Sequence, residues 1–421
     1  MTRAAASAPN EVAPASGGRA AIFARFLRFG LFAWGGPVAQ IAMLRHELVD
    51  QERWVTSDRF NRLLAVYQVL PGPEAHELAV HLGLVRGGRA GAFLAGLGFM
   101  LPGFLLMLLL SWLYLRIDIT QPPVAATLLG AQIAVVALVT RAVPRIGRHI
   151  LVDPWTWAIA IAAGVATLAG VPFWIVLSLS ALAAVLATWG PAGDRGRVAA
   201  AGALATLGVL AVVAALSGAG ALPGAVAPPA APPAATAASA PDALALFGSG
   251  LKAGLLTFGG AYTAIPFVRH DAVGNGWLTD AQFLDGLALG GILPAPLIIF
   301  GTFVGFLAGG LPGAIAITIG IFLPAFSFAL LLGDRLEALM EWRPLHRALE
   351  GVAAGVVGII AVTAIQLGQA VAVRVPSLAV GIVIFAVALG ILFTWRSRWA
   401  TPLVVGAGAA AGWLLFGGLG A

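Results

Sequence analysis

Long apolar runs separated by short polar segments fill most of this chain. A run of about 20 apolar residues has the length of an α-helix that crosses a hydrocarbon layer about 30 Å thick. The first half of the chain contains seven such runs, at residues 21–44, 60–85, 90–115, 124–143, 155–171, 172–189 and 198–217. The second half contains six, at residues 244–268, 283–309, 312–332, 345–367, 376–393 and 400–416. The pattern predicts an all-α polytopic membrane protein with thirteen transmembrane segments.

The composition supports this fold class. The 421 residues are 60% hydrophobic and 10% charged, and the mean hydropathy is +0.96. Too few polar side chains remain to cover the water-facing surface of a soluble domain. Cysteine is absent, which excludes disulfides, thiolate metal sites and cysteine nucleophiles. The arginines are scattered through short loops and form no basic stripe, so no nucleic-acid partner is expected.

Two segments differ from the apolar runs. Residues 1–20 are rich in Ala, Ser, Pro and Gly, and we expect a disordered cytoplasmic tail. Residues 219–243 are rich in Ala and Pro and contain one charge, Asp242, so we expect an extended linker. The domains are therefore predicted at residues 21–218 and 244–421.

The second domain repeats the first. Gly35-Gly36 recurs 224 residues later as Gly259-Gly260, and Pro71 and Pro73 recur at a shift of 223 as Pro294 and Pro296. Seven segments before the second copy would start it from the opposite face of the membrane. The halves are thus predicted to form an inverted-topology repeat, in which many secondary transporters place a binding site near the midplane.

The distribution of arginines predicts the orientation. With a cytoplasmic N-terminus, most arginines, Arg269 among them, fall on the cytoplasmic side, and the linker and the C-terminus fall outside. The loop from Arg45 to Arg62 is the exception, because it places Arg45, Arg53, Arg59 and Arg62 outside. A first segment of each repeat that re-enters the membrane, instead of crossing it, is the alternative that this loop leaves open.

Helix breakers occur at matching positions of the two halves. Proline lacks the N–H that a helix needs, so Pro71-Gly72-Pro73 and Pro294-Ala295-Pro296 should each divide a segment into two half-helices. The second half-helix begins near Glu74, and its first amides carry partial positive charge that suits an anion. A single break is compatible with a structural kink, whereas two matching breaks favour a binding site.

Glycine pairs break the first segment of each half. The amides of Gly35-Gly36, before Pro37, and of Gly259-Gly260 can wrap an oxyanion, although close helix packing is the alternative. Two cations lie within these segments, each seven residues before its glycine pair: Arg28 and Lys252. They are candidates to counter a dianion, or they extend to the membrane interface.

Several acids and histidines raise other possibilities. An ionised Glu74 would repel an anion, so a proton-coupled role or a helix-capping role suits it better, and His76 and Glu77 are further proton-coupling candidates. His76 and His81 are five residues apart, whereas zinc-protease histidines are four apart, so no metal and no cofactor is expected. His46 and His270 lie beside Arg and an acid and are expected to form solvated charge clusters.

Three motifs of the first half resemble the chromate ion transporter family in its two-domain form: Phe29-Gly30-Leu31-Phe32-Ala33-Trp34-Gly35-Gly36-Pro37, Gln68-Val69-Leu70-Pro71-Gly72-Pro73 and Gly98-Phe99-Met100-Leu101-Pro102-Gly103-Phe104. The second half is similar to the C-terminal domain of that family in Thr257-Phe258-Gly259-Gly260, Gly291-Ile292-Leu293-Pro294-Ala295-Pro296 and Phe322-Leu323-Pro324-Ala325-Phe326.

The resemblance implies a bacterial inner-membrane antiporter or exporter that expels chromate and confers resistance, with sulfate as a competitor. It is compatible with a homodimer in the lipid bilayer. Two alternatives stay open. One is a carrier of sulfate or another oxyanion with the same fold. The other is an intramembrane metal-dependent enzyme that uses His76, Glu77 and His81.

Overall fold

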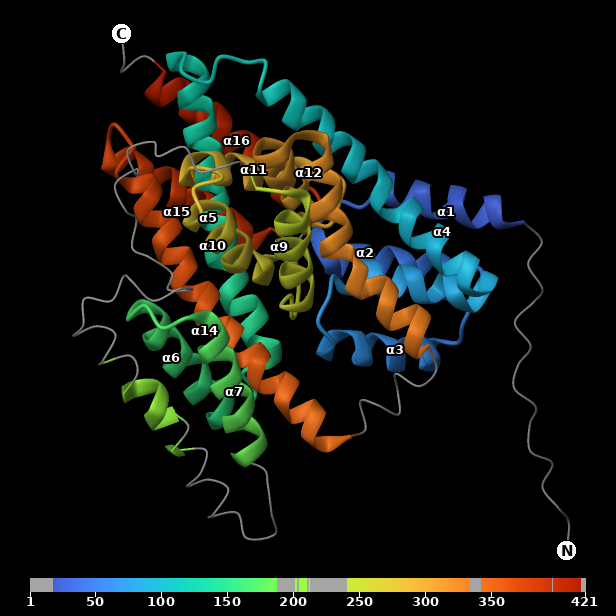
Figure 1. Ribbon diagram of the computed structural model, residues 1–421. Helices are drawn as coiled ribbons and strands as arrows, with labels where there is room; N and C mark the ends of the chain where they lie inside the picture. Colours follow the sequence, from blue (N-terminus) through green and yellow to red (C-terminus); the bar gives the residue numbers. More distant parts are fainter. Residues whose placement is uncertain are drawn as a thin grey trace, which may run out of the picture.

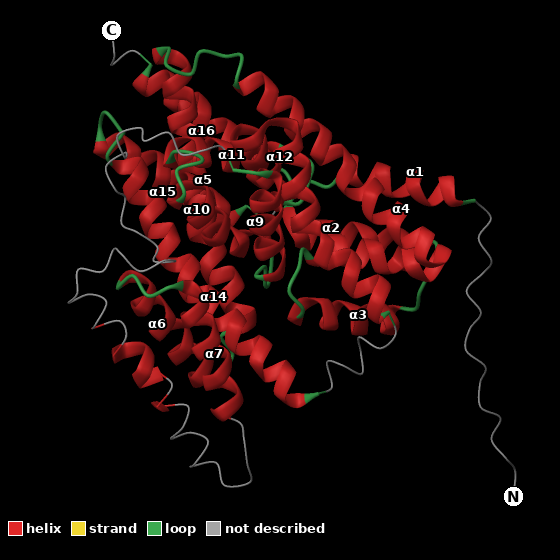
Figure 2. Cartoon of the chain, in the orientation of Figure 1, coloured by secondary structure: helices red, strands yellow, loops and turns green. Residues whose placement is uncertain are grey.

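The computed structural model describes residues 18–187, 201–202, 204–209, 212, 241–333, 342–395 and 397–417. Its regular elements within these ranges are all helical (Figure 2). Four stretches are long and apolar enough to cross a membrane: α4 (Glu74–Tyr114), α5 (Pro122–Ile150), the run Leu297–Leu332 and α14 (Arg343–Ala372). The predicted class, a helical membrane protein, is therefore confirmed. Most of the predicted tail, most of the linker and most of segment 198–217 lie outside the described residues, whereas Arg19 and Ala20 of the predicted tail belong to the first helix.

The first predicted segment, residues 21–44, is not one continuous helix. It consists of α1 (Arg19–Leu31) and α2 (Gly36–Arg45), followed by the π-helix η1 (His46–Gln51). Arg25 of α1 forms ion pairs with Glu47, at 3.3 Å, and with Glu52. A straight helix would hold positions 25 and 47 about 33 Å apart, so the prediction of one span is wrong. Gly35 and Gly36 have φ values of 96° and 73°, where glycine is favoured, and they reverse the chain.

The second predicted segment, residues 60–85, also reverses. Helix α3 (Ser57–Val69) ends before the Pro71-Gly72-Pro73 break, and α4 begins directly after it. The hydroxyl of Tyr67 lies 2.9 Å from Nδ1 of His81. In a continuous helix these two residues would be about 21 Å apart. The proline break therefore divides the segment into two helices, as predicted, but α3 and the first part of α4 form a hairpin instead of one span.

Helix α4 contains a second reversal. Gly87 (φ −136°, ψ 18°) and Gly88 (φ 61°, ψ −158°) interrupt it, and Gly83 packs against Gly91 on the other side of the turn. The predicted boundary between residues 85 and 90 is thus a sharp turn. We call the part of α4 before Gly87 its short arm and the part after Gly88 its long arm.

The second half repeats these reversals. Helix α12 (Phe300–Ser327), between η3 (Leu297–Ile299) and η4 (Phe328–Leu332), turns at Gly309 (φ −143°, ψ 20°) and Gly310 (φ 62°, ψ −155°). The angles nearly equal those at Gly87 and Gly88. The sequence repeat is thus also a repeat of local backbone geometry.

The second half contains two more hairpins, both before α14. Helix α9 (Ala243–Leu255) is followed by η2 (Ala261–Ala264) and α10 (Ile265–Gly274), and Lys252 forms an ion pair with Asp271. Helix α11 (Asp280–Ile292) runs beside α12, where the rings of Phe283 and Phe300 meet at 5.6 Å between centroids. Each half therefore begins with the same order of hairpins.

The two halves exchange their last helices. Helix α5 packs against α15 (Leu378–Thr394) and α16 (Ala400–Phe416) of the second half, and α14 packs against α6 (Pro154–Leu168) and α7 (Phe173–Ala187) of the first. Gly130 of α5 lies against Gly408 and Gly412, where no added Cβ would fit. Small residues let membrane helices approach this closely. The exchange leaves α1, α2 and α3 at one side of the molecule and α15 and α16 at the other (Figure 1).

Candidate functional site

The ends of the hairpins meet across the two halves. The amide of Gly72, in the first proline break, donates a hydrogen bond of 2.8 Å to the carbonyl of Thr257, just before the second glycine pair. The indole of Trp34, just before the first glycine pair, donates to the carbonyl of Ile292 at 3.4 Å. Ala295 of the second proline break packs on Gly103 of α4. The proline break of each half therefore lies close to the glycine pair of the other half.

A cavity of about 320 Å³ lies beside the contact between Gly72 and Thr257. Four of the predicted site residues line it: Pro37, Glu74, Gly259 and Gly260. Its remaining wall comes from α3, α5, η2 and α14, and includes Gln68, Arg145, His149, Tyr262 and Glu350. This cavity brings together Pro37, which follows the first glycine pair, Glu74, which follows the first proline break, and the second glycine pair. We therefore take it as the candidate binding site.

The second glycine pair forms part of the wall of this cavity. Gly259 and Gly260 have φ values of 68° and 122°, which glycine tolerates and other residues rarely adopt. Thr263 fixes the turn, because its hydroxyl accepts from the Phe258 amide at 2.9 Å and donates to the Gly260 carbonyl at 2.8 Å. The amides of Gly259 and Gly260 have no acceptor among the described residues. They are thus available to an anion.

Arg145 is the cation of the cavity. It lies on α5, close enough to Glu74 and Tyr262 to interact with both electrostatically, and within the described residues it forms no hydrogen bond or ion pair. The apolar pattern did not indicate this residue, because the predicted segment 124–143 ends two residues earlier. Helix α5 continues to Ile150, and this extension carries Arg145 to the cavity.

The other predicted site residues do not line the cavity, although Pro71, Gly72 and Pro73 directly precede Glu74, which does. Arg28 is exposed on α1, and Lys252 pairs with Asp271 and lies 5.2 Å from the centroid of the Phe173 ring. Gly35 packs against the backbone of Arg398, and Gly36 has open space around it. Pro294 and Pro296 are buried but do not line the cavity.

His76 and Glu77 lie just behind the cavity in the short arm of α4. The imidazole of His76 is surrounded by the rings of Phe99, Phe322 and Phe326, at 4.7 to 6.1 Å between centroids. His46 is exposed, whereas His270 stacks edge-on against Phe173, which differs from the solvated cluster that we expected. In the part of the chain that the structure describes, no group of three or more His, Asp or Glu side chains could hold a metal ion.

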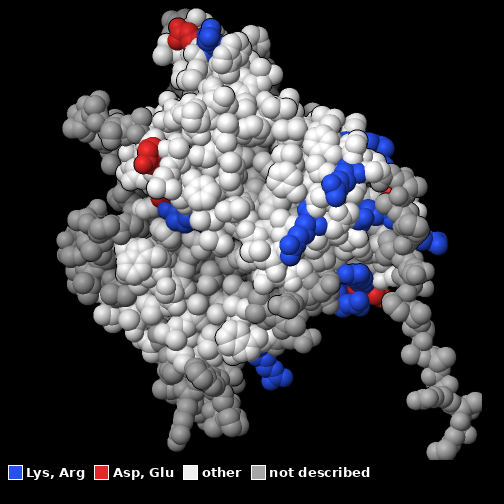
Figure 3. Space-filling view, turned by 45° about the vertical axis from the view of Figure 1, so that its right-hand side comes forward, with Lys and Arg blue, Asp and Glu red and all other residues white. Residues whose placement is uncertain are grey.

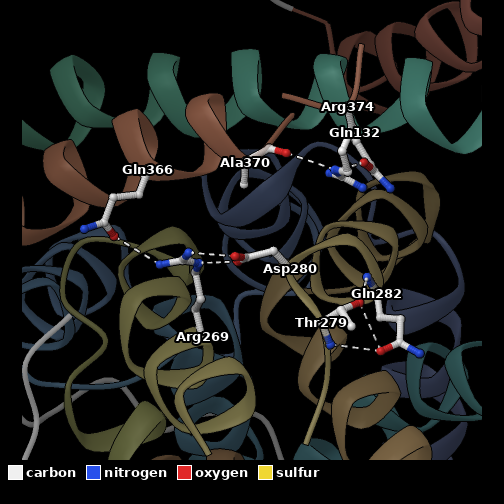
Figure 4. A network of polar contacts seen from close by, with 8 residues as sticks. All are labelled: Gln132, Arg269, Thr279, Asp280, Gln282, Gln366, Ala370 and Arg374. Atoms are coloured by element: carbon white, nitrogen blue, oxygen red, sulfur yellow. Dashed lines mark hydrogen bonds and ion pairs between the residues drawn. The ribbon is translucent and has the colours of Figure 1, made fainter. Parts of the chain in front are cut away.

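The sequence analysis also missed a buried polar network centred on Asp285 of α11. Asp285 accepts hydrogen bonds from Gln132 of α5 at 2.6 Å and from Tyr114 of α4 at 2.9 Å. Gln132 in turn accepts from Arg374, which also donates to the carbonyl of Ala370 (Figure 4). These bonds tie helices of both halves together.

Arg269 joins the same region from α10. Its guanidinium donates two hydrogen bonds to Asp280, at 2.8 and 3.1 Å, and one to Gln366 of α14 at 3.0 Å (Figure 4). On α14, Gln366 lies nearer to Arg374 than to Arg343. Arg269 therefore lies toward the Arg374 end of α14, whereas the arginine distribution predicted Arg269 on the cytoplasmic side and Arg374 outside.

Known proteins place the chain in a family. The chromate transporter profile matches twice, at residues 20–189 and 244–413. The chain is 55% identical to a chromate transport protein of Pseudomonas aeruginosa, over 98% of this chain and 96% of that protein. It is 29% identical to a chromate transport protein of Cupriavidus metallidurans, over 91% and 90% of the two chains. It is 27% identical to a probable chromate transport protein of Synechococcus elongatus, over 92% and 93%.

No solved structure matches the chain. The two profile matches coincide with the two halves that share the hairpins and the breaks. Members of this family are transport proteins and not enzymes. The chain belongs to the chromate transporter family and is a multi-pass membrane protein.

Proposed function

We propose that this protein is a secondary transporter that exports chromate from the cytoplasm across the bacterial inner membrane and so confers chromate resistance. The observation that supports this best is a cavity that Arg145 lines together with Gly259 and Gly260, whose amides have no acceptor among the described residues. A tetrahedral dianion can accept hydrogen bonds from backbone amides on one side and from a forked guanidinium on the other.

Glu74 has a defined place in this proposal. Without substrate it is the acidic neighbour of Arg145 in the cavity. A bound dianion and the Glu74 carboxylate would both be attracted to the guanidinium of Arg145, and the two anions would repel each other at short range. This competition limits how tightly chromate is held, and a transporter has to release its substrate on the far side.

The membrane potential can drive the export. Moving a dianion out of a negative-inside cell is downhill by about 4.6 kcal/mol per 100 mV, twice the value for a single charge. The sequence has no Walker motif that would indicate ATP hydrolysis. A potential-driven carrier therefore suffices for export.

We further propose that the first two segments of each half are re-entrant hairpins. The guanidinium of Arg86, at the end of the short arm of α4, lies 5.2 Å from the centroid of the Trp54 ring, which precedes α3. The loop from Arg45 to Arg62 then lies on the cytoplasmic side with Arg25 and Arg86, which removes the exception to the positive-inside rule. The basic side chains visible in Figure 3 gather mainly on the half that α1, α2 and α3 occupy in Figure 1.

The re-entrant hairpins of the second half have the opposite orientation in the membrane in this proposal. Arg269 lies toward the Arg374 end of α14, so the hairpins of the second half enter from outside. Four re-entrant segments leave an odd number of crossings. The inverted repeat, the cytoplasmic N-terminus and the external C-terminus are therefore retained in the proposal, while the thirteen full crossings are not.

Single cysteines test this topology, because the chain has none of its own. Ser57 and Thr120 are both exposed. We expect Thr120→Cys to react with a membrane-impermeant maleimide in intact cells, and Ser57→Cys to react only in inverted vesicles. A continuous first span would instead place both positions outside. Labelling of Ser57→Cys in intact cells would therefore contradict the re-entrant hairpin.

The transport activity is tested in proteoliposomes. We expect labelled chromate to move in response to an imposed potential, in the direction that carries negative charge toward the positive side, and unlabelled sulfate to compete. Liposomes without protein give the background rate. The proposal of chromate export fails if the protein moves sulfate or another oxyanion under the same potential while chromate flux stays at background.

A further inference from the structure

Glu77 is a buried carboxyl group that has no partner among the described residues. It lies on the short arm of α4, one turn after the first proline break, and has 0% exposure. Neither of its oxygens has a hydrogen-bond partner among the described residues. Two other buried carboxylates are paired: Asp285 accepts two hydrogen bonds, and Asp271 pairs with Lys252. Since nearly all buried polar groups in proteins are paired, Glu77 requires an explanation.

No Lys or Arg among the described residues forms an ion pair with Glu77. The titratable groups near it are Glu74 and His81 on the same helix and Tyr67 on α3, and the Tyr67 hydroxyl is bonded to His81. The neighbouring His76 points its ring at phenylalanines, and its two nitrogens are also unpaired among the described residues. Arg145 belongs to the cavity and neighbours Glu74.

A charged carboxylate does not suit such a site. Without a hydrogen bond or a cation, its burial costs several kcal/mol, whereas the uncharged acid avoids most of this cost. The uncharged acid still lacks an acceptor for its own O–H among the described residues. Neither protonation state of Glu77 is therefore fully satisfied in this conformation of the protein. A group that is satisfied only after its surroundings change is suited to gain a proton in one conformation and to lose it in another.

Glu77 touches the contact that joins the two halves. Its carboxyl group lies directly against Gly72, where no side chain would fit. The amide of Gly72 donates to Thr257, two residues before the glycine pair that lines the cavity. A change at Glu77 is therefore transmitted through Gly72 and Thr257 to the donors for the anion.

We propose that Glu77 carries one proton into the cell for each chromate that leaves. This inference rests on the proposed function and adds the coupling ion. The O–H bond of Glu77 breaks when the site opens to the cytoplasm, and the proton passes to water there. The bond re-forms with a proton from water outside. Chromate is unchanged, and no other reactant takes part.

This stoichiometry makes a measurable prediction. At zero membrane potential, one proton exchanged for one dianion sets the outside-to-inside chromate ratio equal to the outside-to-inside proton ratio. A pH difference of one unit then produces a tenfold chromate gradient, about 1.4 kcal/mol. The ratio is set by thermodynamics, so a variant that only slows transport still reaches it.

The experiment clamps proteoliposomes at zero potential with valinomycin and equal potassium. The pH is kept high enough on both sides for chromate to be a dianion. We expect the tenfold ratio per pH unit for the unmodified protein and for Asp118→Asn, which removes an exposed carboxyl group. For Glu77→Gln we expect a ratio of one, with chromate counterflow still present.

Each outcome decides between the proposals. A tenfold ratio with Glu77→Gln, or a ratio of one with the unmodified protein, overturns the role of Glu77 and leaves chromate transport intact. Absence of chromate counterflow in the unmodified protein overturns the proposed function itself. If Glu77→Gln is inactive in counterflow, Glu77→Asp decides: it keeps an acid and should restore the tenfold ratio, and a ratio of one would reject the proposal.

Discussion

Replacing Arg145 with glutamine is expected to weaken chromate binding at least thirty-fold. Arg145 is the cation that lines the cavity together with the amides of Gly259 and Gly260. Loss of one partner from a largely desolvated, hydrogen-bonded charge pair costs about 2 kcal/mol or more, and 2 kcal/mol corresponds to about thirty-fold in affinity. The measurement is the concentration dependence of chromate flux in proteoliposomes.

The matched control is Arg148→Gln, one turn further along α5. Arg148 is exposed and does not line the cavity, and its loss changes the net charge by the same amount. We expect it to leave the concentration dependence unchanged. Arg145→Lys should fall between the two, because lysine keeps the charge but not the planar fork. An unchanged concentration dependence in Arg145→Gln would remove this cavity as the chromate site.

The sequence predicted where the chain breaks, but not what each break does. Proline and glycine pairs end a helix for local reasons, so Pro71, Pro73 and the glycine pairs could be found from the sequence alone. Whether the chain then continues or reverses depends on contacts such as that between Tyr67 and His81. Such contacts join residues 14 or more positions apart, and a pattern of apolar residues does not contain them.

The positions of the charged residues gave some indication of where the chain reverses. The arginines between Arg45 and Arg62 fell on the wrong side of a crossing first segment, and the pair of Arg25 with Glu47 now explains why. For Arg145, the apolar pattern ended at Val143, although the helix continued. Arg145 therefore looked like a loop residue, and only the three-dimensional path of α5 brings it beside Gly259.

Asp285 is a residue whose partners could not be predicted from the sequence. A single acid inside a predicted span is a sign of function or pairing, but its partners Gln132 and Tyr114 come from other helices of the first half. Nothing in their spacing relates them. The sequence repeat predicted the two halves, whereas the hydrogen bonds between the halves could be found only from the structure.

Replacing Gly72 with alanine is expected to be the most damaging single substitution in the breaks. Gly72 has a φ of 152°, which side chains rarely adopt, and a Cβ there would collide with the carboxyl group of Glu77. The backbone strain costs about 1–2 kcal/mol and the overpacking about 1–3 kcal/mol more. The shift would also disturb the hydrogen bond to Thr257 that joins the halves. We expect a lowered Tm in detergent and chromate flux reduced at least a hundredfold.

Gly276→Ala is the matched control, because Gly276 also has a positive φ, 70°, but has open space around it. It should cost only about 1 kcal/mol, from backbone strain alone, and leave flux nearly unchanged. The cause of the Gly72 effect is tested by adding Glu77→Ala to Gly72→Ala. Removing the carboxyl group relieves the collision, so the double variant should recover part of the lost Tm, which is a non-additive effect of two residues in contact. If the two losses simply add, the collision with Glu77 is not the cause, and Gly72 acts through its backbone conformation alone.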